Sequence, residues 1–116
     1  MRTITIHHES ELNQKLQIVA DEKAEGGASH SYTISGDGVA CLVEFQKGAL
    51  KEAGFNGISD EALLAVVIDR LRCFQSGPFS CRENALALTN IEQGLLWLNA
   101  RTKDRMARGV EGKAAA

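Results

Sequence analysis

The sequence predicts an α+β protein, in which a small N-terminal antiparallel β-sheet is followed by a long antiparallel αα-hairpin. Two patterns lead to this prediction. Short segments in the first half alternate apolar and polar residues, as strands with one buried face do. In the second half, apolar residues recur at steps of three and four, as along one face of an α-helix. We interpret the 116 residues as a single domain, divided into a β-rich part (1–47), a connector (48–58), a helical hairpin (59–109) and a tail (110–116).

The β-rich part contains four candidate strands. Residues 2–8 alternate threonines with isoleucines, and residues 15–21 also alternate, although a short helix fits the second segment as well. Residues 30–35 and 39–45 flank Gly36-Asp37-Gly38, and Gly and Asp tolerate the positive φ that a tight hairpin turn needs. These last two segments therefore predict a β-hairpin.

The first predicted helix spans about residues 59–75. Ser59 can cap its first turn, and the carboxylates of Asp60 and Glu61 suit the positive end of the helix dipole. Gly77-Pro78 ends the helix, because proline cannot continue it. Its predicted apolar seam consists of Leu64, Val67, Leu71 and Phe74.

The second predicted helix begins at Cys81 and stops before Gly109, which gives about 28 residues, or roughly 42 Å. Ser80 and Glu83 have the S-x-x-E spacing of a capping box. The short loop before it predicts that the two helices fold back on each other. One seam runs along the helix and contains Asn84, Leu88, Ile91, Leu95, Leu98, Thr102 and Arg105.

The length of this helix predicts self-association. The mean helix has only about 11–12 residues, and a thin sheet cannot cover both sides of a seam of this length. We therefore expect a second copy of the chain to cover the helices. The expected assembly is a homodimer or a higher homo-oligomer such as a hexamer.

The charge of the chain is unevenly distributed. Residues 1–61 carry five basic and ten acidic side chains, net −5, and residues 62–116 carry eight and five, net +3. The formal net charge of −2 disfavours general binding to DNA or RNA. An anionic partner is therefore expected on the helical half.

Cysteine usage and hydropathy predict a soluble, intracellular protein with no membrane partner. Cys41, Cys73 and Cys81 lack metal-ligand spacing, and an odd number suits a reducing compartment. The N-terminus lacks the apolar core of a signal peptide, and no segment approaches the roughly 20 apolar residues of a membrane span.

No pattern of catalytic or metal-binding residues is apparent in the sequence. His7 and His8 fall in a predicted strand, so their side chains are expected on opposite faces, where they cannot chelate one metal together. His30 adds only a weak zinc signal, and no phosphate-cradling glycine loop is present. We expect a protein without catalytic residues, metal or cofactor, and therefore not an enzyme.

Three features of the hairpin suit an anionic ligand, and each has a structural alternative. Arg101, Arg105 and Arg108 share one helical face, where they either stabilise the helix C-terminus or bind phosphate through guanidinium forks. Asn84 either sets the register of packed helices or hydrogen-bonds a nucleoside. Phe74 either packs in the core or stacks on a purine. Spacing alone favours the structural role for the arginines.

Three segments resemble the first Thoeris anti-defence family of phage proteins, whose hairpin domain also occurs in smaller anti-CBASS sponges. They are VEFQKGALKEAGFNGISDEALLAVVIDRL, FQSGPFSCRENALALTNIEQGLLWL and RTKDRMARGVEG. The resemblance covers about residues 43–112. It implies a phage protein in the cytoplasm of the infected bacterial host. Such a sponge binds the glycocyclic ADP-ribose signal made by the TIR-domain enzyme and withholds it from the Thoeris effector.

The resemblance also implies roles for four residues of this chain. Phe74 would stack on the adenine, Asn84 would hydrogen-bond the nucleoside part, and Arg101 with Arg105 would hold the pyrophosphate. Cyclic di- or trinucleotides of CBASS systems are further candidate ligands, because some members bind them at a separate site between subunits.

The helix geometry then predicts a shared pocket. Asn84 and Arg105 are about 31 Å apart along a straight helix, which exceeds the roughly 10 Å size of the ligand. A second, antiparallel copy is therefore needed to complete the pocket. Two other functions stay open: a nucleic-acid-binding regulator that uses the arginine face, and a structural or assembly protein whose arginines are only capping charges.

Overall fold

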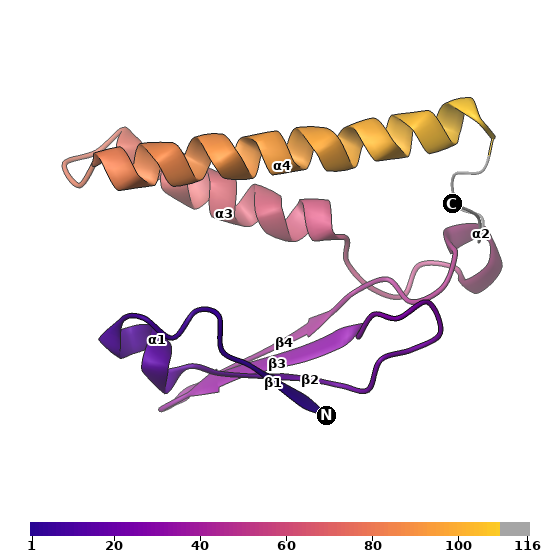
Figure 1. Ribbon diagram of the computed structural model, residues 1–116, viewed down its shortest axis with the longest axis horizontal. Helices are drawn as coiled ribbons and strands as arrows, with labels where there is room; N and C mark the ends of the chain where they lie inside the picture. The colour runs from indigo at the N-terminus through magenta and orange to yellow at the C-terminus, as the bar shows by residue number, and fades with distance from the viewer. Residues whose placement is uncertain (110–116) are drawn as a thin grey trace. The chain divides into compact units, whose positions relative to one another are not determined.

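The structure is a computed structural model that describes residues 1–109. The chain forms two compact units (Figure 1). The first contains residues 1–47 together with 55–58 and is built on the sheet. Among the described residues, the second contains 48–54 and 59–109 and is built on helices. The predicted order of a sheet followed by a helical hairpin is confirmed.

The first unit contains a four-stranded antiparallel sheet in which each strand pairs with the next along the chain. The β3–β4 hairpin is confirmed, because Gly36 pairs with Val39 across a two-residue turn. Gly38 in that turn has a φ of 75°, which favours glycine. The strands are β1 (Arg2–Ile4), β2 (Gln17–Ala20), β3 (Ser31–Gly36) and β4 (Val39–Glu44).

The first predicted strand was too long, and a helix follows it. The chain turns after β1, where the His8 N–H donates to the Thr5 carbonyl. Helix α1 (Glu11–Lys15) then begins after Ser10, whose hydroxyl accepts the Asn13 N–H at 3.1 Å. The strand predicted within residues 15–21 is confirmed as β2, and α1 is a separate helix that the sequence analysis did not predict.

The two neighbouring histidines consequently lie in the turn, and their predicted placement on opposite faces is wrong. The His7 and His8 rings meet edge to face with centroids 4.3 Å apart. Both Nε2 atoms approach the Leu16 carbonyl oxygen, at 2.7 and 3.3 Å. A turn brings neighbouring side chains together, whereas a strand would separate them.

The second unit is dominated by two antiparallel helices, α3 (Asp60–Gln75) and α4 (Arg82–Ala107), with the short α2 (Leu50–Ala53) before them. The predicted cap of α3 is confirmed, since the Ser59 hydroxyl accepts the Ala62 N–H at 3.0 Å. The cap of α4 is Cys81 rather than Ser80, because Sγ of Cys81 accepts the Asn84 N–H at 3.4 Å. The predicted Ser80–Glu83 capping box is thus wrong, and the cap lies one residue later than expected.

The predicted seam of α4 is confirmed, because all seven of its residues are half-buried or buried. Helix α4 has 26 residues, or about 39 Å, and Gly109 follows it with a φ of 72°, as a C-terminal stop should. In the predicted seam of α3, Leu64, Leu71 and Phe74 are half-buried as expected. Val67 is wrong, because it is 40% exposed and its neighbour Ile68, at 4%, is buried instead. Within residues 1–109, no helix combines the length and the apolar character needed to cross a membrane.

Candidate ligand-binding site

The turn between α3 and α4 holds two of the predicted ligand contacts at one end of the hairpin. Phe74 lies in the last turn of α3 and Asn84 in the first turn of α4, and both are half-buried. Gln75 fixes the turn, because its side-chain amide donates to the Cys81 carbonyl and accepts the Cys81 N–H, both at 3.1 Å. These bonds hold the start of α4 beside the end of α3.

An ion pair between the helices fixes their register. The Arg72 Nε and Nη2 atoms donate to Glu92 Oε2 at 3.0 and 2.6 Å. Both side chains are partly exposed, at 63% and 35%, so solvent screening limits the contribution of the pair to stability. Beside it lies a cavity of about 340 Å³, lined by Ile68, Arg72, Glu92, Leu95, Leu96 and Asn99.

Arg70 lies next to Phe74, and the sequence reasoning missed it. The Arg70 Cζ atom is 5.0 Å from the centroid of the Phe74 ring, within cation–π range. The two residues are separated by one helical turn on α3. The i, i+4 spacing of Arg70 and Phe74 could have predicted this contact from the sequence. The guanidinium thus covers one face of the ring that was predicted to stack on adenine.

The three arginines near the end of α4 differ from one another. Arg101 is exposed, whereas Arg105 is only 8% exposed and takes part in further interactions. Arg108 pairs with Asp104, one turn earlier, at 3.0 Å. Arg108 therefore forms a surface ion pair at the helix end. Arg101 is exposed and forms no ion pair within residues 1–109.

One hairpin does not bring all four predicted contacts together. Helix α4 runs without a break from the turn to its C-terminal end (Figure 1). Along it, Arg101 is about 26 Å from Asn84, and Arg105 is about 31 Å away. The structure therefore places Phe74 with Asn84 at one end of the hairpin and Arg101 with Arg105 at the other.

The side of α4 opposite the seam carries exposed apolar residues. Trp97 is 77% exposed, Leu96 67% and Leu86 47%. A shallow cavity of about 450 Å³ lies on this side, lined by Gln93, Leu96, Trp97 and Ala100. Leu96 and Trp97 both line this cavity, so two large apolar side chains are exposed together on this side of the helix.

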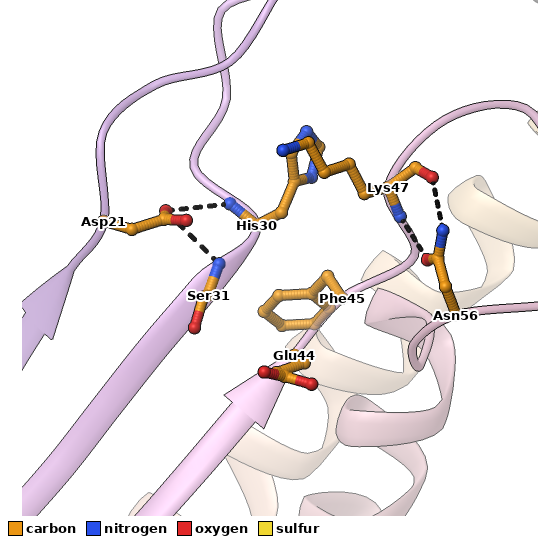
Figure 2. A pocket seen from close by; sticks show the side chains of 7 residues that line it. All are labelled: Asp21, His30, Ser31, Glu44, Phe45, Lys47 and Asn56. Carbon is orange, nitrogen blue, oxygen red and sulfur yellow. Dashed lines mark hydrogen bonds between the residues drawn. The ribbon is translucent and has the colours of Figure 1, made fainter. Parts of the chain in front are cut away.

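A separate cavity of about 280 Å³ lies in the first unit. Its lining carries both charge signs, and Figure 2 shows that two of its polar side chains bind backbone groups. The Asp21 carboxylate accepts the His30 and Ser31 N–H groups, and the Asn56 amide bonds both backbone groups of Lys47. The lining residues are Asp21, His30, Ser31, Glu44, Phe45, Lys47 and Asn56.

No metal centre accompanies these cavities in the part of the chain that the structure describes. Among residues 1–109, no three His, Cys, Asp or Glu side chains are grouped so that they could hold an ion. The three cysteines are free and exposed. The helical hairpin is therefore the candidate site, with aromatic and amide groups at one end and guanidinium groups at the other.

Comparison with known proteins shows which family the helical hairpin belongs to. The profile of the Acb2/Tad1 hairpin domain matches residues 38–103, which include Phe74, Asn84 and Arg101 and end just before Arg105. Thoeris anti-defense 1 from Bacillus phage SBSphiJ7 is 49% identical over 88 residues, covering 75% of this chain and 62% of the relative. The match thus spans less than two thirds of the relative's length. Because the profile match covers more than half of the chain, this chain belongs to the Acb2/Tad1 hairpin-domain family.

Proposed function

We propose that this protein is a phage anti-defence sponge, which binds glycocyclic ADP-ribose made by TIR-domain enzymes and withholds it from the Thoeris effector. It would act in the cytoplasm of the infected bacterial host. The name of the 49% identical relative, Thoeris anti-defense 1, supports this role. The observation that carries the proposal is the placement of aromatic, amide and guanidinium groups at the two ends of one hairpin.

The proposed pocket forms between two copies of the chain. If a second hairpin packs with its α4 antiparallel to the first, its C-terminal end lies beside the first chain's turn. Phe74 and Asn84 of one copy then meet Arg101 and Arg105 of the other. Twofold symmetry gives two such pockets per dimer.

Each group in the proposed pocket suits one part of the ligand. The Phe74 ring offers a face for the adenine, and the Asn84 amide both donates and accepts hydrogen bonds. The two arginines match a pyrophosphate through their forked donors. A cyclic ADP-ribose has on the order of 35 non-hydrogen atoms, and about 0.3 kcal/mol per atom gives about −10 kcal/mol, a dissociation constant in the nanomolar range.

We propose sequestration rather than cleavage, so that the protein is not an enzyme. None of the four proposed contacts is a usual nucleophile or general base, because their side chains are two guanidinium groups, an amide and a phenyl ring. The ligand would thus be held intact. Cyclic di- and trinucleotides of CBASS systems are additional candidate ligands at a separate site.

The test loads the protein with the product of a TIR enzyme, removes unbound molecules by filtration, and then denatures the protein by heat. The released material should activate the Thoeris effector. Recovery of hydrolysed ADP-ribose alone would instead identify an enzyme. If no signal is retained, the sponge proposal is wrong.

Two alternative functions predict different experimental outcomes. A nucleic-acid-binding regulator would shift DNA or RNA in a gel, and the shift would weaken steeply with salt. A structural or assembly protein would bind neither ligand. In that case, Arg101→Ala would change stability by only a few tenths of a kcal/mol, because the side chain is exposed.

A further inference from the structure

The Arg70 guanidinium occupies the ring face that a ligand would need. Its Cζ atom lies 5.0 Å from the Phe74 centroid, and the Arg70 side chain is exposed while the ring is half-buried. A purine that stacks on this face has to displace the guanidinium. The Arg70 side chain is therefore positioned to respond to the arrival of a ligand.

Arg70 also forms no ion pair with a carboxylate among residues 1–109. Arg72 pairs with Glu92 and Arg108 pairs with Asp104. For Arg70, by contrast, the contact that the described residues provide is the ring of Phe74. Its five N–H donors are thus available for an oxygen-rich ligand.

We propose that Arg70 is a further ligand-binding residue, which leaves the Phe74 ring when the base stacks there and donates to a phosphate of the same nucleoside diphosphate. This inference rests on the proposed function. The exchange is favourable because a cation–π contact at an exposed site is weak, whereas a guanidinium–phosphate hydrogen bond is charge-assisted and often bidentate. The turn end of the hairpin then contributes a cation of its own to phosphate recognition.

The proposal predicts whether removing the charge of Arg70 lowers or raises the affinity for the ligand. Arg70→Met keeps a long, unbranched side chain with good helix propensity but removes the charge and all donors. If Arg70 binds phosphate, affinity falls. If Arg70 only covers the ring and competes with the base, affinity rises.

The experiment measures the affinity for glycocyclic ADP-ribose by calorimetry, at low and high salt, for the wild type and three variants. We expect Arg70→Met to weaken binding about 10- to 100-fold, with a reduced salt dependence. Arg70→Lys keeps the charge without the fork, so a smaller loss is expected. Lys23→Met, which removes an exposed charge from the first unit, should bind like the wild type. Circular dichroism confirms that each variant retains its helices.

Two outcomes would overturn the proposal, and they are distinguishable. If the wild type binds and Arg70→Met binds equally well or more tightly, Arg70 does not contact the ligand, and the sponge function stands. If the wild type itself does not bind glycocyclic ADP-ribose, the proposed function is wrong and this inference falls with it.

Discussion

Gln75 is expected to hold together the turn end of the ligand site. Its amide makes two hydrogen bonds to the Cys81 backbone, each 3.1 Å long, and thereby fixes the start of α4 relative to the end of α3. Gln75→Ala removes both bonds without leaving a cavity, because they are exposed. Each exposed bond contributes about 0.5–1 kcal/mol, so the hairpin should lose about 1–2 kcal/mol.

Thermal unfolding followed by circular dichroism measures this loss. For a domain of this size, each 1 kcal/mol lowers Tm by about 4–8 °C. Affinity for glycocyclic ADP-ribose should fall as well, because Phe74 and Asn84 are no longer held in place. Gln93→Ala is the matched control, since Gln93 is exposed on the same hairpin and should change stability by less than about 0.5 kcal/mol. An unchanged Tm for Gln75→Ala would refute this role of the turn.

Three further predictions concern stability. Gly57→Ala should destabilise the first unit by about 2–3 kcal/mol in urea unfolding, because its Cβ would lie 2.4 Å from the Phe45 carbonyl carbon; wild-type stability would show that the backbone relaxes freely. Gly94→Ala, where no atom lies within 4 Å, should stabilise α4 by about 0.5–1 kcal/mol, and a loss would indicate a neighbour at that position. Cys81→Ser should raise the Tm slightly, because a hydroxyl caps a helix better than a thiol; a lower Tm would mean that the sulfur packs in a way the hydroxyl cannot.

The helical hairpin could be predicted from the sequence because its signals are local and repeated. The seam of α4 recurs over seven positions, so one periodicity places all of them. Ser59 and Gly109 mark helix ends by their own backbone chemistry. On α3, however, the sequence could not decide between Val67 and Ile68, which are neighbours of similar hydrophobicity. Packing against the facing helix, α4, determines which of the two side chains is buried.

The errors in the first unit have a similar origin. Threonines and isoleucines alternate from Thr3 to Ile6, yet pairing with β2 ends at Ile4, where the chain turns toward α1. Alternation shows which side chains suit a strand but not where the partner strand stops. The turn then brings His7 and His8 together.

The candidate site could be predicted only in part. The sequence placed the four proposed ligand contacts on the hairpin, but the contact between Arg70 and Phe74 depends on side-chain conformation and was found only in the structure. Likewise, sequence spacing separates Asn84 from Arg101 by about 26 Å, and in the proposed dimer a second copy of the chain would close that distance.

The shared pocket is the central claim, and complementation between two variants tests it most directly. Asn84→Ala and Arg101→Ala each remove one contact, from opposite ends of the hairpin, and Arg101 is exposed, so its loss should leave the fold intact. Each variant alone should bind glycocyclic ADP-ribose about 10-fold or more weakly. In a re-equilibrated equal mixture, about half of the dimers are mixed, and each has one pocket with both contacts present. The account predicts that about a quarter of all pockets regain wild-type affinity; if no high-affinity fraction appears although the subunits exchange, the pocket is not shared between two copies.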